Sequence, residues 1–194
     1  MSGNQKSTAA HSGRGKLKRA PAVIPIFVIP GILGSRLGQG GRLIWNPAGA
    51  GAFTFRSLLA GLQFDDPGPL TCVTSILRDM NQVLVPEDRF GRYPKGHKFH
   101  ELGEKVPGFY GAVVSFYGEL VRELVEELPK DLGGRWIPKV CVFGYDWRQP
   151  NDKTAALLEQ RVTSFRAKLK AQGFRVKNNI LLAHSMGGLV SRHS

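Results

Sequence analysis

The amino-acid sequence predicts an α/β fold in which a mostly parallel sheet carries helices on both faces. Apolar runs typical of buried strands occur at 23–29, 140–143 and 180–182. Amphipathic helical patterns separate these runs, at 111–128 and from 152 to Gly173. Strands that are connected through helices pair in parallel with right-handed crossovers, so this order of elements predicts a parallel sheet.

The ends of both helices are marked by residues that favour helix termini. Pro129 and Gly133–Gly134 follow the first helix, and Gly173 follows the second. Asp152 is expected to cap the start of the second helix. The apolar face expected of this second helix consists of Ala156, Leu157, Val162, Phe165 and Leu169.

Ser185 stands where the last strand turns into a helix. The pattern small-x-Ser-x-Gly is typical of the strained elbow that raises a serine hydroxyl above the edge of a sheet. Ala183 and Gly187 are expected where strand and helix nearly collide, and Gly188 is expected to let the helix pack close to the sheet. Ala183 departs from the commoner glycine. The alternative is a serine in an ordinary strand–helix turn.

A glycine-containing loop, Pro30–Ser35, follows the first strand. One alternative is a phosphate-binding loop, but the Walker lysine and the spacing of a dinucleotide fingerprint are absent. In serine hydrolases of the α/β type, the loop after the third strand supplies one backbone N–H of the oxyanion hole. We interpret Pro30–Ser35 in this second way, because its glycines allow the backbone to approach a substrate closely.

The region 38–109 is irregular and rich in Gly, Pro and aromatic residues, and it is too long for a simple connection. We predict a lid or cap insertion here, within a domain that covers 23–194. Its apolar residues either face lipid or pack on the main domain: Trp45, Phe53, Phe55, Leu58, Leu59, Leu62 and Phe64. Residues 1–22 are predicted to form a disordered basic arm, either a solvated tail or a segment attracted to acidic phospholipid or nucleic acid.

The formal net charge of +12 suggests an anionic partner, and nucleic acid and an anionic membrane surface explain it equally well. No nucleic-acid-binding motif occurs, so no specific nucleic-acid partner is expected. Neither a secretory signal nor a run of ~20 apolar residues is seen, which predicts a cytoplasmic or peripheral-membrane location. Cys141 is expected to be a buried small hydrophobe, and Cys72 lies in the irregular region. We expect no metal and no cofactor.

Four stretches together resemble the lecithin:cholesterol acyltransferase family, and its bacterial members most: Pro30–Leu37, Leu43–Trp45, Phe143–Arg148 and Ala183–Val190. The resemblance implies an α/β-hydrolase fold with Ser185 as the nucleophile. It also implies acyl transfer from a phospholipid or other lipid ester to an alcohol or water.

The same resemblance assigns roles to three further residues. It places the N–H donors of the oxyanion hole at Leu33 and Met186. It implies that Trp147 lines or supports the acyl site. Asp146 precedes the nucleophile, so it is interpreted as a structural residue that fixes the loop beside the pocket rather than as the triad acid.

The acid and histidine of a triad follow the serine in this fold, each from a later strand. His184 is expected to point to the opposite side of the strand from Ser185, and His193 lies about 12 Å along the helix at 1.5 Å per residue. His97 and His100 precede the nucleophile. We therefore expect the chain to be the N-terminal part of an acyltransferase domain, truncated after the elbow and catalytically inactive alone.

The function predicted from the sequence is a serine-dependent lipid O-acyltransferase. The expected partner is a phospholipid or other lipid ester, together with a peripheral membrane contact. A lipase or esterase is an alternative with the same chemistry and water as the acceptor. A basic membrane- or nucleic-acid-binding fragment without catalysis is the alternative from another class.

Overall fold

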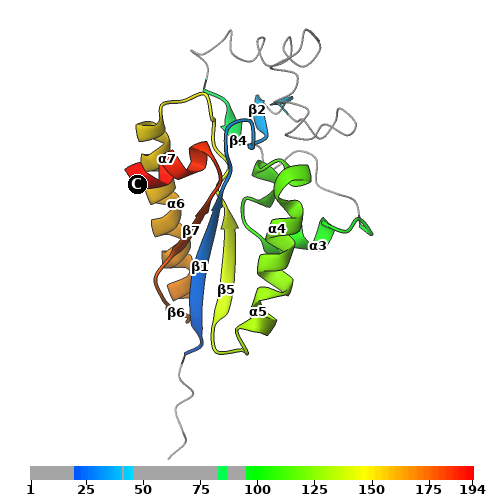
Figure 1. The fold of residues 1–194 in the computed structure, drawn as a ribbon, viewed down its shortest axis with the longest axis vertical. Coiled ribbons are helices and arrows are strands. Elements are labelled where there is room, and N and C mark those ends of the chain that lie inside the picture. Colours follow the sequence, from blue (N-terminus) through cyan, green and yellow to red (C-terminus); the bar gives the residue numbers. More distant parts are fainter. Residues whose placement is uncertain (1–19, 41, 46–82, 87–94) are drawn as a thin grey trace, which may run out of the picture.

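The main sheet of the protein is parallel and has β1 (Ala22–Ile29) at its centre. The computed structural model describes residues 20–40, 42–45, 83–86 and 95–194. β5 (Ile137–Val142) pairs along one edge of β1. β6 (Arg175–Val176) and β7 (Ile180–Ala183) pair at successive positions along the other edge. The predicted parallel arrangement of the three apolar runs is confirmed (Figure 1).

Helices cover both faces of this sheet (Figure 1). α6 (Asn151–Ala171) and α7 (Met186–His193) lie on one face. α3 (His100–Lys105), α4 (Val114–Glu126) and α5 (Leu128–Asp131) lie on the other. The predicted α/β class, with helices on both faces of a parallel sheet, is therefore confirmed.

Alternating side chains of β1 supply the two halves of the core. Phe27 packs on the α6 side, where its ring meets that of Phe165 edge to face at 5.6 Å. Ile26 and Val28 pack on the α4 side, in a cluster that includes Val121. Strand side chains alternate between faces, so a strand covered on both sides must be apolar throughout. Each buried side chain of this size contributes about 1.5–3 kcal/mol.

The start of α6 differs from the prediction. The helix begins at Asn151, its N-cap is Pro150 with extended backbone, and no side chain caps it, so the predicted cap at Asp152 is wrong. Asp152 lies within the first turn, where a carboxylate complements the helix dipole.

The buried face of α6 also differs from the predicted one near its start. Ala155 and Leu158 are buried, whereas the predicted Ala156 is exposed and Leu157 is 54 % exposed. Phe165 and Leu169 are buried as predicted. Leu158 precedes Phe165 by seven residues, which is two turns of helix, so these two residues share a face and Leu157 does not.

α4 begins three residues later than predicted because the backbone before it hydrogen-bonds to the segment that follows β1. A 3-10 turn, η2 (Phe109–Gly111), leads into an extended segment. Arg36 donates its N–H to Gly111 O at 2.9 Å, and Val113 donates its N–H to Gly34 O at 2.8 Å. This segment therefore holds the loop that leaves β1, named here the β1 loop (residues 30–35).

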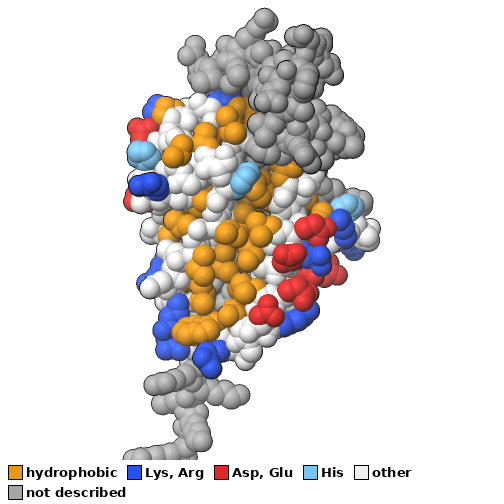
Figure 2. All heavy atoms as spheres, in the orientation of Figure 1, with side chains coloured by type: hydrophobic (Ala, Val, Ile, Leu, Met, Phe, Trp, Pro, Cys, Tyr) orange, Lys and Arg blue, Asp and Glu red, His pale blue; other side chains and the backbone are white. Residues whose placement is uncertain are grey.

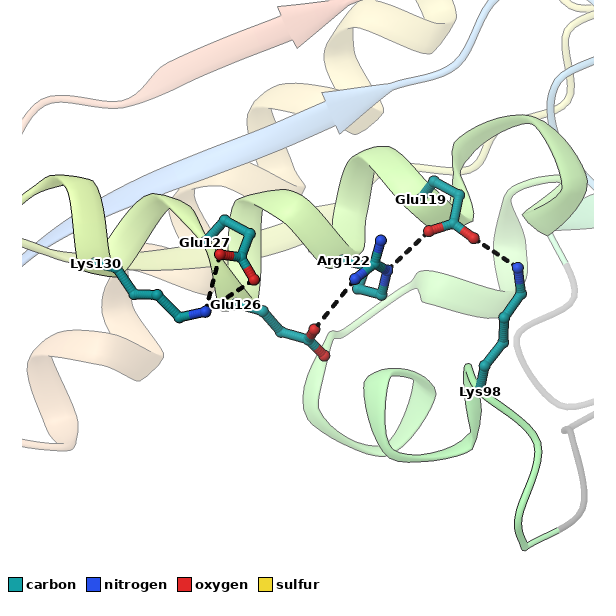
Figure 3. A network of polar contacts seen from close by, with 6 residues as sticks. All are labelled: Lys98, Glu119, Arg122, Glu126, Glu127 and Lys130. Atoms are coloured by element: carbon teal, nitrogen blue, oxygen red, sulfur yellow. Dashed lines mark hydrogen bonds and ion pairs between the residues drawn. The ribbon is translucent and has the colours of Figure 1, made fainter.

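The outer surface of α4 and α5 carries ion pairs (Figure 3), and acidic and basic side chains lie side by side over these helices in the space-filling view (Figure 2). Glu119 bonds Lys98 at 2.6 Å and Arg122 at 2.8 Å, and Arg122 also approaches Glu126. Lys130 pairs with Glu127 at 2.8 Å. These side chains are largely exposed, and ion pairs in water contribute little to stability. The network is interpreted as a solvated face rather than a site.

A small antiparallel sheet lies beyond the β1 loop, with β2 (Leu37–Gln39) between β3 (Arg42–Trp45) and β4 (Val85–Pro86). Trp45, one of the apolar residues of the predicted lid, is 4 % exposed and packs on the main core. The other six, Phe53, Phe55, Leu58, Leu59, Leu62 and Phe64, lie outside the described residues. So do Cys72 and residues 1–19 of the predicted arm.

Cys141 is fully buried on β5, as predicted. No helix in the described ranges combines the length and the apolar character that crossing a bilayer requires.

Candidate active site

Ser185 occupies the sharp turn between β7 and α7. Its backbone has φ 52° and ψ −122°, in a region that side-chain-bearing residues rarely adopt. Among the described residues, Leu33 is the one other non-glycine residue with positive φ. Such strain persists only where surrounding structure imposes it, and it concentrates at functional sites. The serine is exposed, so the predicted elbow has both the strained backbone and the accessible side chain that a nucleophile needs.

Gly187 makes the elbow sterically feasible. A Cβ added there would lie 2.5 Å from Ile29 O and 2.6 Å from Pro30 O. The role predicted for Gly188 is wrong, because a Cβ at Gly188 would meet nothing within 4 Å. Neighbouring residues on a helix point about 100° apart, so only Gly187 faces the end of β1.

The β1 loop lies directly against the elbow. A Cβ on Gly31 would come within 2.9 Å of Ser185 Cβ. Gly34 donates its N–H to Gly31 O at 3.0 Å, which closes a tight turn that has Leu33 at φ 62°. Trp45 Nε1 donates to Leu33 O at 3.0 Å and fixes this turn from the small sheet.

The two predicted oxyanion donors, Leu33 and Met186, lie on the two segments that meet at Ser185. Leu33 is 6 % exposed and belongs to the β1 loop. Met186 is the first residue of α7, so its N–H has no acceptor within the helix, and the helix dipole places partial positive charge there. Both segments are therefore adjacent to the serine, and the use of their N–H groups as oxyanion donors stays a prediction.

Tyr117 is a site residue that sequence reasoning missed. Its hydroxyl accepts the N–H of Gly31 at 2.9 Å and lies 2.9 Å from Nδ1 of His184. Burial raises the pKa of Tyr117, although the hydrogen bond from Gly31 opposes this shift, so the phenol is neutral at pH 7. The sequence signal was a tyrosine on the apolar stripe of a helix, where a buried hydroxyl requires a partner.

Tyr145 holds the β1 loop as well. Its hydroxyl donates to Pro30 O at 2.8 Å, and its backbone N–H donates to Ser35 Oγ at 3.0 Å. Burial raises the pKa of Tyr145 well above its ordinary value, with a smaller contribution from nearby Tyr117. The loop is thus fixed by Tyr117 from α4 and by Tyr145 from the segment after β5.

The carboxylate of Asp146 makes several buried structural hydrogen bonds. Its carboxylate accepts Arg148 Nε at 2.9 Å, Arg148 Nη2 at 2.8 Å and the N–H of Leu84 at 3.0 Å. Burial raises the pKa of this carboxyl, but the hydrogen bonds from Arg148 and Leu84 outweigh that effect, and the pKa lies below its ordinary value. These contacts support the structural interpretation of Asp146.

Trp147 is 4 % exposed and meets the ring of Trp45 edge to face at 5.9 Å. Its buried Nε1 has no hydrogen-bond partner in the described part of the chain. A cavity of about 600 Å³ opens nearby, lined by β4, by the segment after β5 and by α6. Neither Trp147 nor Ser185 lines this cavity, so the role of Trp147 beside an acyl chain stays a prediction.

The Ser185 hydroxyl makes no hydrogen bond within residues 20–40, 42–45, 83–86 and 95–194. His184 contacts Tyr117, and His193 is the last residue of α7. His97 accepts the N–H of Phe99. A serine without a positioned base is a weak nucleophile. The described residues therefore supply the turn and candidate N–H donors, but no base bonded to the serine.

The comparisons with known proteins agree with the fold and overturn the family. No protein-family model and no curated protein matches the chain, so its assignment to the lecithin:cholesterol acyltransferase family is contradicted. The motifs that suggested it have local structural explanations here. Gly31 allows close contact with the elbow, and Asp146 pairs with Arg148 inside its own loop.

A structural match exists to the crystal structure of the Tle4–Tli4 complex, with a TM-score of 0.56 and 21 % sequence identity. The match covers 89 % of this chain and 42 % of the other, so the chain spans less than half the length of the protein it resembles. At 21 % identity this similarity concerns the fold alone. It supports the mixed α/β class with a parallel sheet.

Proposed function

We propose that Ser185 is the nucleophile of an α/β-hydrolase-type site that takes the acyl group of a carboxylic ester and transfers it to water or to an alcohol. The observation that carries the proposal is the strained backbone of Ser185 between a parallel strand and a helix, in contact with the β1 loop. An ordinary strand–helix turn does not require positive φ at a serine or a glycine two residues later.

The chemistry of such a site has two balanced steps. Ser185 Oγ attacks the ester carbonyl while its proton passes to a base outside the described residues. The N–H groups of Leu33 and Met186 stabilise the oxyanion, and the alcohol portion leaves with a proton. Water or a second alcohol then attacks the acyl-enzyme, loses its proton to the base and restores the serine.

Exposed apolar side chains on the two segments that meet at Ser185 favour a lipid ester as substrate. Ile32 in the β1 loop is 44 % exposed, and Leu189 on α7 is 54 % exposed. These residues belong to the two segments that flank Ser185. Exposed apolar residues around a reactive group favour contact with an acyl chain or with a lipid surface.

An ester-hydrolysis assay tests the proposal with imidazole as an external base. We expect purified protein to release nitrophenol from nitrophenyl acyl esters in an imidazole-dependent burst. The burst is lost in Ser185→Ala and kept in the control Ser191→Ala, whose native hydroxyl bonds Gly187 O within α7. An equal burst in Ser185→Ala contradicts the proposal. Adding an alcohol acceptor and measuring the new ester separates transfer from hydrolysis.

A further inference from the structure

We propose that Tyr117 is a positioning residue that locks the β1 loop to the elbow and thereby sets the geometry between Ser185 and the oxyanion donors. The inference rests on the proposed function of Ser185. One phenolic oxygen bonds both sides of the site, because it accepts the N–H of Gly31 and lies 2.9 Å from Nδ1 of His184. His184 precedes the nucleophile directly, and Gly31 begins the turn that contains Leu33.

The hydrogen-bonding capacity of the hydroxyl allows both contacts at once. A tyrosine hydroxyl has one proton and two lone pairs. Gly31 N–H occupies one lone pair. The contact with Nδ1 of His184 then uses either the hydroxyl proton, donated to Nδ1, or the second lone pair, which accepts a proton from Nδ1. In either case one hydroxyl oxygen bonds both Gly31 and His184.

The space around the hydroxyl is fitted to a tyrosine. A Cβ on Gly34 would lie 2.8 Å from Tyr117 Oη, and a Cβ on Gly31 would lie 3.0 Å from Nδ1 of His184. Both glycines therefore leave room that the phenol and the imidazole occupy. Phenylalanine fills the ring position but leaves the N–H of Gly31 without this acceptor.

Tyr117 also connects layers that the chain order does not connect. It comes from α4, which packs on one face of the sheet, whereas α7 packs on the other face (Figure 1). The hydroxyl thus ties α4 to the residue before Ser185. A rigid elbow matters because oxyanion donors are effective only when they are held in place before charge develops.

The link also determines which N–H groups of the β1 loop are available to an oxyanion. The N–H of Gly31 is bonded to Tyr117 and is not available to an oxyanion. The N–H of Gly34 is bonded to Gly31 O, so the N–H groups of Ile32 and Leu33 are among those left for an oxyanion, and Leu33 is the donor proposed above. His184 is likewise bonded away from Ser185, which assigns it to positioning rather than to proton transfer.

Nuclear magnetic resonance tests the link without relying on activity. In Tyr117→Phe we expect the ¹⁵N signals of His184 to show a changed tautomer ratio and the Gly31 amide to exchange at least about tenfold faster. Tyr145→Phe is the matched control, since its hydroxyl holds the same loop through Pro30 O but does not contact His184. Unchanged His184 signals and Gly31 exchange in Tyr117→Phe overturn the inference.

The rate at which a fluorophosphonate labels Ser185 in imidazole buffer tests the positioning effect. We expect Tyr117→Phe to slow this labelling by about tenfold or more, because small misplacements reduce rates steeply. His184→Ala should slow it similarly, and the double variant should be no slower than either single one. If Tyr117→Phe does not fold, the exchange rate of the Gly31 amide and the labelling rate of Ser185 in His184→Ala test the inference instead.

The possible failures are distinguishable. If wild-type Ser185 is not labelled at all, the proposed function fails. The nuclear magnetic resonance measurements on His184 and Gly31 still test whether Tyr117 links the β1 loop to the elbow. If labelling is normal in both Tyr117→Phe and His184→Ala, the positioning role is wrong even though the contacts exist.

Discussion

Gly31 and Ser185 lie so close together that a Cβ on Gly31 would come within 2.9 Å of Ser185 Cβ. The loop after the central strand and the turn after the last strand are thus one packed unit, although they are distant in sequence. The same Cβ would lie 3.1 Å from His184 O. This contact defines the candidate site, because it brings the Leu33 turn next to the serine.

The first prediction concerns Gly31→Ala. The added methyl group has to displace the elbow or the loop, so we expect the free energy of unfolding to fall by about 1–3 kcal/mol. Fluorophosphonate labelling of Ser185 in imidazole should fall more steeply than stability. Urea denaturation and labelling kinetics measure the two effects. A variant with wild-type labelling would show that the contact does not position the serine.

The second prediction compares two adjacent glycines of α7. Gly187→Ala should destabilise the protein by about 1–3 kcal/mol, because its Cβ would overlap Ile29 O and Pro30 O. Gly188→Ala meets open space and should stabilise the helix by about 0.5–1 kcal/mol. Denaturation midpoints of the two variants give the comparison. Equal effects would mean that α7 does not approach β1 as described.

The third prediction is a pH dependence centred on Asp146. Its carboxylate is buried against Arg148, so Asp146→Asn should lower the free energy of unfolding at pH 7 by about 3 kcal/mol or more. The folded-state pKa of Asp146 is depressed below its ordinary value of 3.8. The contribution of Asp146 is therefore present above that value and is lost as the pH falls through the folded-state pKa.

Urea denaturation of wild type and Asp146→Asn from pH 7 down to pH 3 measures this dependence. The difference between the two proteins should be constant at neutral pH and shrink in acid. Glu119→Gln is the control, because Glu119 is exposed and pairs on the surface, and its effect should be much smaller. A difference that stays constant down to pH 3 would contradict the assigned pairing.

Much of the fold could be predicted from the sequence because its signals are local. β1 is apolar throughout since both of its faces are covered, and Ser185 stands between an apolar run and a helical pattern. The register of α6 was harder to predict. Leu157 and Leu158 are equally apolar, and only the packing against the sheet decides which one is buried.

The contacts between distant segments were not accessible from the sequence. Tyr117 has the spacing of a core residue, and nothing in its neighbourhood reveals that its hydroxyl lies beside Gly31 and His184. The delayed start of α4 has the same origin, since the backbone before it pairs with the β1 loop. The family assignment failed for a related reason. Short motifs report local turn geometry, which unrelated sequences of one fold class share.

The most direct test of the account is to map where a fluorophosphonate attaches when the protein is treated with it in imidazole buffer. The account predicts one dominant adduct, on the peptide that contains Ser185, and its loss in Ser185→Ala. Exposed serines without a strained turn, such as Ser164 on α6, should remain unlabelled. Adducts spread over several serines, or labelling that survives in Ser185→Ala, would contradict the claim that Ser185 is the nucleophile.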